Sequence, residues 1–384
     1  MKRMLTAAAA IVGCWTGLLA GADATAGSQG PEQVEFKFKF EPGRTYRQRI
    51  TSNSAGALAL PAPLAEQKFR QVFEQVLTST CRKVNADGSA VFDLTLSDVA
   101  MNMSVGGFKM EYDSRTFDPK TADPALALVG RFFEAMNGVT FSVTLSDTGR
   151  PLKVEGLAAG MKKALNRIEA QAGGGEMKGF FDQLAGFMDD ESMNQQMQSY
   201  YRMAPETPGP VKVGEKWSQT WAMKMPFVGG SFEGRGDYEL LGIEELQGRR
   251  CAKIRVKESF KMQPRAAGAA AGAEGESAMA RMLAGLKMEL STSGGDGIAY
   301  IDCLRGELVR LRQTQTMTIG MTVPTTDNPE GAAAVAAPSF TMNIRTSVSI
   351  DTLDATAEPA TKPAAGPVRA VRRPAQAATR PSGG

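Results

Sequence analysis

Alternation of apolar and polar residues dominates the chain and predicts a β-rich fold. In the segment VEFKFKF at 34–40 every second residue is apolar, as expected for a half-buried strand. The same period recurs at 339–351, where one face carries Phe340, Met342, Ile344, Val348 and Ile350. Further strands are predicted at 44–50, 68–84, 90–105, 139–145, 151–157, 215–225, 231–242, 249–262, 286–293, 297–303 and 307–323.

Turn residues divide these segments into hairpins. Asp87-Gly88 and Asp147-Thr148-Gly149 supply residues that favour positive φ between paired strands. The alternation shifts by one residue between Leu96 and Met101, which predicts a bulge near Asp98. An antiparallel arrangement follows, since short turns join neighbouring strands.

Helices are predicted at about 121–203, in the middle of the chain. Asp123-Pro124 suits a helix start, with the aspartate as N-cap and the proline as first helical residue. Apolar residues then recur at helical spacing up to Met136, from Leu157 to Ile168 and from Met177 to Met188. The sequence therefore predicts an α+β fold: a curved, half-barrel-like antiparallel sheet, with helices inserted between two β-modules.

A weak internal echo accompanies this layout. Gly43-Arg-Thr-Tyr46 is similar to Gly214-Glu-Lys-Trp217, and the Asp147 hairpin is similar to one that begins at Asp302. The body at 34–354 is therefore either a duplication, with halves 34–156 and 210–351 joined by helices at 157–203, or one domain with similar turns. A leader at 25–33 precedes the body, and a basic tail at 355–384, rich in Pro and Ala, is expected to be disordered.

The first 24 residues have the pattern of a signal peptide. A charged start precedes an apolar run, and Ala22-Asp23-Ala24 predicts cleavage after Ala24, with Ala26 as the alternative. The segment ending at Cys14 also resembles a lipoprotein box, so lipid anchoring at Cys14 is a second alternative. We expect an extracytoplasmic protein, periplasmic or secreted, with no transmembrane span in the mature chain.

Charge is concentrated at the termini. Of the net charge of +3, residues 1–24 carry +1 and residues 355–384 carry +4, which leaves −2 for the body. A near-neutral body offers no basic face for nucleic acid, so no nucleic-acid partner is predicted.

The chain has no histidine, which excludes Ser/His and Cys/His nucleophile pairs. Carboxylate chemistry needs no histidine, and Asp189, Asp190 and Glu191 are the candidates for it. They are better explained as the acidic first turn of a helix. We therefore predict no catalytic residues, no cofactor and no metal site, and rank a carboxylate-dependent hydrolase third among the functions.

Methionine is abundant, with 21 residues. The pairs Met101/Met103 and Met223/Met225 could in principle hold Cu(I), but a core position explains them better. Adaptable Met-rich space also suits a lipid or other apolar ligand. Binding of an apolar ligand or lipidated partner is our first hypothesis, and an envelope module that contacts another protein is the second.

Three cysteines lie beyond Cys14, so at most one intrachain disulfide can form. Cys251 and Cys303 fall in two predicted strands and are the candidate pair, with Cys81 as a buried thiol. The alternative is that all three are small core residues.

Several segments together resemble a family of secreted bacterial proteins of unknown function, over about residues 34–350. They are FKFEPGRTYRQRI, NADGSAVFDLTLSDVAM, FSVTLSDTGRPLKVEGL, PVKVGEKW, DYELLGIEELQGRRCAKI and GIAYIDCLRGELVRL. The layout of strands around inserted helices also resembles the LolA/LolB-type lipoprotein carriers, which implies a half-barrel sheet around an apolar cavity. Neither resemblance implies catalytic residues.

Overall fold

Twelve strands pair into one long antiparallel sheet in the computed structural model. The structure describes residues 33–59, 66–106, 108–119, 122, 124–172, 203, 205, 209–225, 230–263, 287–322 and 339–353. The strands of this sheet are β2 (Thr45–Ala59), β3 (Gln67–Val84), β4 (Ala90–Val105), β5 (Phe108–Asp113), β6 (Thr140–Leu145), β7 (Pro151–Glu155), β9 (Lys216–Met225), β10 (Gly230–Leu246), β11 (Arg249–Gln263), β12 (Lys287–Asp302), β13 (Leu308–Thr322) and β14 (Ser339–Leu353).

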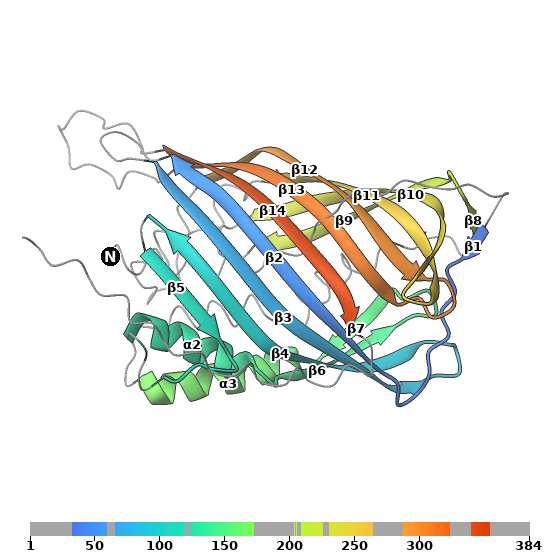
Figure 1. The fold of residues 1–384 in the computed structure, drawn as a ribbon, viewed down its shortest axis with the longest axis horizontal. Helices are drawn as coiled ribbons and strands as arrows, with labels where there is room; N and C mark the ends of the chain where they lie inside the picture. Colours follow the sequence, from blue (N-terminus) through green and yellow to red (C-terminus); the bar gives the residue numbers. More distant parts are fainter. Residues whose placement is uncertain are drawn as a thin grey trace, which may run out of the picture.

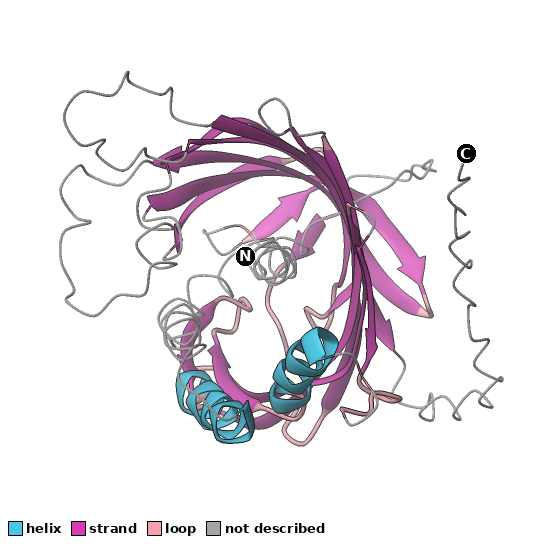
Figure 2. Ribbon diagram, turned by 90° about the vertical axis from the view of Figure 1, so that its left-hand side faces the viewer, coloured by secondary structure: helices cyan, strands magenta, loops and turns pink. Residues whose placement is uncertain are grey.

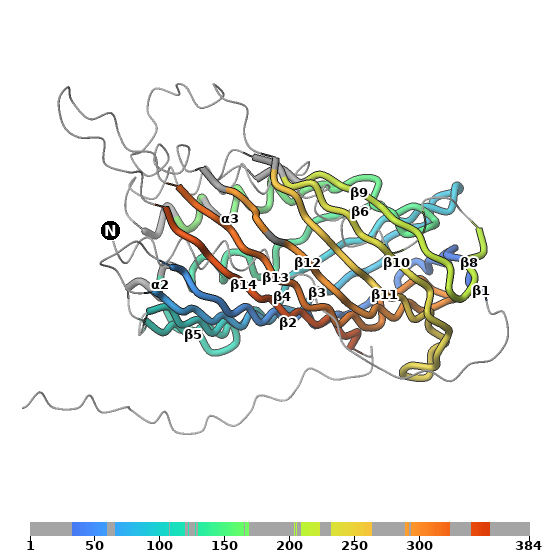
Figure 3. Tube along the Cα trace, turned by 90° about the horizontal axis from the view of Figure 1, so that it is seen from above, coloured from blue at the N-terminus to red at the C-terminus, as the bar shows by residue number. Residues whose placement is uncertain are grey.

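The sheet joins the two halves of the chain edge to edge. Its order is β7-β6-β4-β3-β2-β14-β13-β12-β11-β10-β9, with β5 also paired to β4. The first and last long strands, β2 and β14, therefore lie side by side at the centre (Figures 1 and 3). Each hairpin adds a neighbouring strand, so the described parts of both halves form one continuous meander.

The sheet curves into an open arc whose edge strands are β7 and β9, and helices lie at one end of it (Figure 2). The described helices are α2 (Pro124–Met136) and α3 (Leu157–Ala172), and α2 begins at the predicted proline. Among the residues described, no helix has the length and apolar character that crossing a bilayer requires. The α+β class and the curved antiparallel sheet are confirmed.

Helix α2 packs on the sheet face that we call the inner face. The ring of Phe133 lies 5.9 Å from the ring of Phe73 on β3. Phe73 is the register partner of Ser52 on β2, which in turn faces Val348 on β14, so these residues share that face. One apolar cluster joins the helices to β3–β7, and a second lies against β10–β14.

The segment at 34–40 has the predicted burial pattern but is not a strand of the main sheet. Only β1 (Gln33–Glu35) is a strand, and it pairs with β8 (Pro210–Lys212) in a separate two-stranded ladder. Val34 and Phe36 are buried in the second apolar cluster, while Lys37 and Lys39 are exposed. Packing of the apolar face explains the alternation without a long ladder.

Phe38 connects the two halves by lying between their hairpin turns. Its backbone N–H donates to the carbonyl of Asp147 at 2.7 Å. Its ring occupies the space next to both Gly149 (φ 78°) and Gly306 (φ 68°), where a Cβ on either glycine would overlap it. The two turns that were similar in sequence thus contact the same side chain.

The two similar segments that begin at Gly43 (φ 80°) and Gly214 (φ 86°) also make matching pairs of backbone hydrogen bonds. The bonds are Gly43 N to Cys81 O (2.7 Å) and Cys81 N to Arg44 O (2.8 Å), against Gly214 N to Leu240 O (2.7 Å) and Leu240 N to Glu215 O (3.1 Å). The echo therefore corresponds to a shared local geometry.

The strands also test two further predictions. The bulge near Asp98 is confirmed, because Asp98 has φ 51° and the β3–β4 register shifts beside it. The predicted break between 293 and 297 is wrong, since β12 runs through Gly294, Gly295 and Gly297 without interruption. Glycine normally weakens a strand, so these glycines point to close packing against that part of the sheet.

Candidate functional site

Buried polar side chains form a continuous row across the inner face. Antiparallel pairing makes each member the register partner of the next, so all of them lie on the same face from β3 to β9. The side chains other than the two glycines are all buried. In spatial order this polar row consists of Gln71, Ser54, Thr346, Gln315, Gly295, Glu258, Gly236 and Gln219.

Three neutral members of the polar row have a described hydrogen-bond partner. The hydroxyls of Ser54 and Thr346 lie 3.0 Å apart, and Gln71 Nε2 donates to Met101 Sδ at 3.8 Å. Hydroxyl and amide groups tolerate burial when they are paired in this way. Glu258 is different because it is the one ionisable member.

Glu258 is a carboxyl group held in an apolar environment. Its side chain is only 6% exposed, and Gln313 Nε2 donates to its Oε2 at 2.8 Å. Burial raises the pKa of Glu258 from 4.5 to about 7, opposed by the hydrogen bond from Gln313. No lysine or arginine within the described ranges forms an ion pair with Glu258, so the charged form has no counterion there.

Glycines on both neighbouring strands make room around this carboxyl. The register partners of Glu258 are Gly236 on β10 and Gly295 on β12. A Cβ on Gly295 would lie 3.2 Å from Gln313 Nε2 and 3.7 Å from Glu258 Cβ, and one on Gly297 would lie 2.8 Å from Gln313 Cβ. Gln313 can therefore lie flat on the sheet and reach the carboxyl.

Aromatic side chains lie on the same face as Glu258, on strands β9 to β11. The hydroxyl of Tyr238 lies over Gly236, and the indole of Trp221 lies over Gly234. Trp221 also meets Phe260, which follows Glu258 by two residues on the same strand, with ring centroids 5.9 Å apart at 82°. Three aromatic side chains thus lie on the same face of the sheet as Glu258, on its own strand and on the strands β10 and β9.

Apolar residues flank the polar row on both sides. On one side of the row lie Val348 and Val256, each two residues from a row member on its own strand. On the other side lie Ile344 and Met317, again two residues from a row member. Two flanking polar atoms are buried without a hydrogen-bond partner, Trp217 Nε1 and Ser293 Oγ. A molecule with apolar parts and one polar group would be chemically complementary to these side chains.

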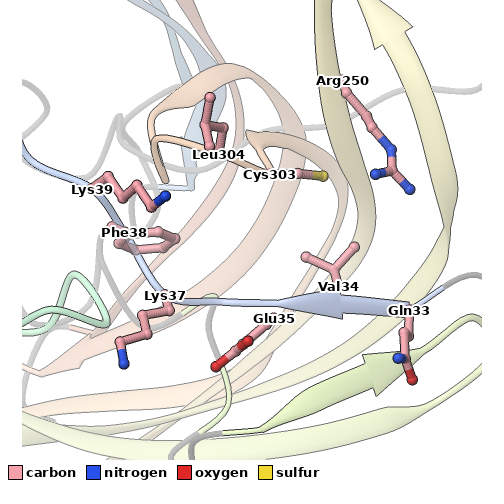
Figure 4. Close-up of a pocket in the computed structure, with 9 residues that line it drawn as sticks. All are labelled: Gln33, Val34, Glu35, Lys37, Phe38, Lys39, Arg250, Cys303 and Leu304. Carbon is pink, nitrogen blue, oxygen red and sulfur yellow. The ribbon is translucent and has the colours of Figure 1, made fainter.

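A separate pocket lies beside β1 and the β12–β13 turn (Figure 4). It has a volume of about 350 Å³ and is partly open to solvent. It is lined by Gln33, Val34, Glu35, Lys37, Phe38, Lys39, Arg250, Cys303 and Leu304. Its cationic groups belong to exposed side chains, in contrast to the buried carboxyl of the polar row.

The cysteines proposed as a pair lie close together but are not bonded in the structure. Cys81, Cys251 and Cys303 are all free thiols. Cys251 is the register partner of Asp302, so Cys303 comes one residue later in the ladder, where an extended chain would turn its side chain to the opposite face. The disulfide between Cys251 and Cys303 remains a prediction. Burial raises the pKa of the Cys251 thiol to about 12.

Other candidate residues have mixed outcomes. Met101 and Met103 are buried in the first apolar cluster, as the core interpretation predicts. Met223 and Met225 lie in β9, but their side chains are outside the described part of the structure. The acidic group Asp189, Asp190 and Glu191 also lies outside it, as do Cys14, Ala24, Ala26 and the tail at 355–384. Within the described ranges no cluster of Cys, Asp and Glu suits a metal ion.

Sequence reasoning missed Glu258, although its signal was present. In KIRVKESF the residues Ile254, Val256, Glu258 and Phe260 alternate on one face, so a carboxyl occupies a position where the pattern calls for an apolar residue. Such an inward polar residue was a reason to expect a site. Gly236 fell within a predicted strand, whereas Gly295 fell in the predicted break between the strands 286–293 and 297–303.

Comparison with solved structures yields matches of low overall similarity. A structure that describes lipid–protein interactions in lipovitellin matches with a TM-score of 0.36 and 11% identity, over 84% of this chain and 27% of that one. The chain therefore spans about a quarter of the length of that relative. DynF from Micromonospora chersina matches with a TM-score of 0.14 and 10% identity, over 86% and 94% of the two chains. OpdQ from Pseudomonas aeruginosa matches with a TM-score of 0.18 and 8% identity, over 81% and 99%.

No curated protein sequence matches the chain. A protein-family model described as a family of unknown function, DUF6263, matches residues 87–296, which is more than half of the chain. The matched region runs from the β3–β4 turn to the middle of β12 and so includes Glu258. The chain belongs to the DUF6263 family.

Proposed function

We propose that this protein is a non-enzymatic, extracytoplasmic binding protein whose ligand is an amphiphile held against the inner face of the sheet. The observation that carries the proposal is the polar row, which contains one buried carboxyl and has apolar residues on both sides. The signal-peptide pattern of residues 1–24 supports the location.

Glu258 holds its carboxyl in a buried position, which costs free energy. A carboxyl removed from water is costly unless it is paired, and replacement of buried polar groups by apolar ones is often neutral or stabilising. Leucine in place of Glu258 would continue the apolar pattern of β11. A polar group at this position therefore fits a role in binding better than a role in stability.

The apolar residues beside the polar row favour an elongated ligand. Val256 and Val348 lie on one side of the polar row, with Ile344 and Met317 on the other. A chain of methylene groups would gain burial along these flanks, at roughly 0.8 kcal/mol for each CH₂. The polar row would then accept the ligand's polar atoms.

The proposal is tested by probe uptake and by native mass spectrometry of gently purified protein. We expect the neutral fluorophore 1-N-phenylnaphthylamine to bind with enhanced fluorescence, and dodecanol to displace it. Exchange of Ile344 for Asp would place a charge beside the polar row and should abolish uptake. Exchange of Arg345 for Asp, at the exposed neighbouring position, is the control and should leave uptake unchanged.

A protein that takes up no probe and carries no co-purified amphiphile would overturn the proposal. If cross-linking instead recovered a protein partner on this face, the function would be that of an envelope interaction module.

A further inference from the structure

We infer that the polar group of the ligand is a cationic ammonium, held by Glu258 between the rings of Trp221, Tyr238 and Phe260. This inference rests on the proposed function, because it names the class of amphiphile that the inner face would bind. It is carried by the combination of a buried acid that pairs with no cation among the described residues and aromatic rings on the same face.

The first step is charge complementarity. Among the described residues, the hydrogen-bond partner of Glu258 is the neutral amide of Gln313, and the other side chains of the polar row are neutral as well. An anionic head group would be repelled by an ionised Glu258, and a neutral one would leave its charge unbalanced. A cation in the ligand would supply the counterion that the described chain lacks.

The second step is the arrangement of the aromatic rings. Phe260 shares strand β11 and the inner face with Glu258, and its ring meets that of Trp221 edge to face. Tyr238 reaches over Gly236, the residue directly opposite Glu258, and its ring stacks on Trp217 with centroids 5.8 Å apart. Aromatic faces beside an acid are the usual surroundings of a bound ammonium group, since the ring faces attract cations.

The third step is the neutral character of the groups beside the carboxyl. Gly236 and Gly295 carry no side chains of their own next to Glu258. The hydroxyl of Tyr238 lies over the first glycine, and the amide of Gln313 lies next to the second. Both of these groups are neutral, so neither can act as the counterion of the carboxyl.

The experiment compares three twelve-carbon amphiphiles that differ only in the head group. Dodecylammonium, dodecanol and dodecyl sulfate are titrated at pH 8 into the full-length mature protein, each below its micelle concentration, and followed by displacement of 1-N-phenylnaphthylamine. We expect dodecylammonium to bind at least about tenfold more tightly than dodecanol, and dodecyl sulfate to bind most weakly.

Two variants separate the head-group contacts from general uptake. Glu258→Gln keeps the shape of the side chain and should remove the tenfold preference for the ammonium while leaving the dodecanol affinity unchanged. Trp221→Leu should weaken dodecylammonium binding several-fold, with a smaller effect on dodecanol. Glu289→Gln is the matched control, because Glu289 is exposed on the adjacent strand β12, and it should change neither affinity.

The outcomes distinguish the two proposals. If none of the amphiphiles binds, the proposed function fails. If dodecanol or dodecyl sulfate binds as tightly as dodecylammonium, or if Glu258→Gln leaves the preference intact, the ammonium inference is overturned while the proposed function stands.

Discussion

Replacing Glu258 by glutamine should stabilise the protein at alkaline pH and leave it nearly unchanged at acidic pH. The perturbation is small in shape, and a glutamine carbonyl can still accept the hydrogen bond from Gln313 Nε2. What changes is ionisation. The carboxyl of Glu258 must lose its proton in a buried site as the pH rises, whereas glutamine is neutral throughout.

The sign follows from the raised pKa. The pKa of Glu258 is about 7 in the folded protein, against a reference value of 4.5, because burial disfavours the charged form. As the pH rises, the carboxyl therefore loses its proton at a lower pH in the unfolded chain than in the folded protein. The contribution of Glu258 to the free energy of unfolding is fully present below about pH 4.5 and is lost as the pH rises through 7. At about 1.4 kcal/mol for each pH unit, the whole loss is about 3 kcal/mol, roughly 2.5 kcal/mol of it between pH 5 and pH 8.

The assay is urea unfolding, followed by tryptophan fluorescence, of the wild type and Glu258→Gln at several pH values from 5 to 8. Other carboxyls also titrate, so the informative quantity is the difference between the two proteins at each pH. We expect that difference to grow in favour of the variant by about 2.5 kcal/mol over this range. A constant difference would refute the reasoning, because it would mean that Glu258 titrates as an ordinary exposed carboxyl.

Two further predictions concern the turns and the thiols. Gly306→Ala should destabilise the protein by at least about 1 kcal/mol more than Gly43→Ala, because both glycines have positive φ but only Gly306 has the ring of Phe38 against it. Thermal unfolding of both variants measures the difference. Equal losses of stability would show that the ring of Phe38 moves aside without cost. In the native protein, iodoacetamide should modify Cys303 and spare Cys251, whose thiol is fully buried with a raised pKa. Peptide mapping would detect this pattern, and a linked Cys251–Cys303 peptide under non-reducing conditions would establish the disulfide instead.

Local structure was largely predictable because it depends on residues close together in the chain. The helix start at Pro124 and the bulge at Asp98 both follow from sequence neighbours, through N-terminal preference and a change in alternation. The face of each strand followed from the same two-residue period. The segment at 34–40 shows the limit of such patterns, since alternation predicts burial and does not identify a hydrogen-bonding partner.

The candidate site was beyond the reach of local patterns. Glu258 could be recognised as an inward polar residue, but its environment depends on Gly236, Gly295 and Gln313, which come from three other strands. From the sequence alone, Gly294, Gly295 and Gly297 could not be distinguished from the residues of a turn between two strands. Only the pairing of β11 with β10 and β12 shows that they make room beside a carboxyl.

The sequence by itself determined a β-rich body with inserted helices, the turns that divide it and the absence of histidine chemistry. The tertiary structure decided that β2 pairs with β14. That pairing in turn determines which polar residues align into one row. The physical reason is that periodicity assigns a side chain to a face, whereas register between strands far apart in the chain assigns its neighbours. A buried acid becomes a candidate binding site only through those neighbours.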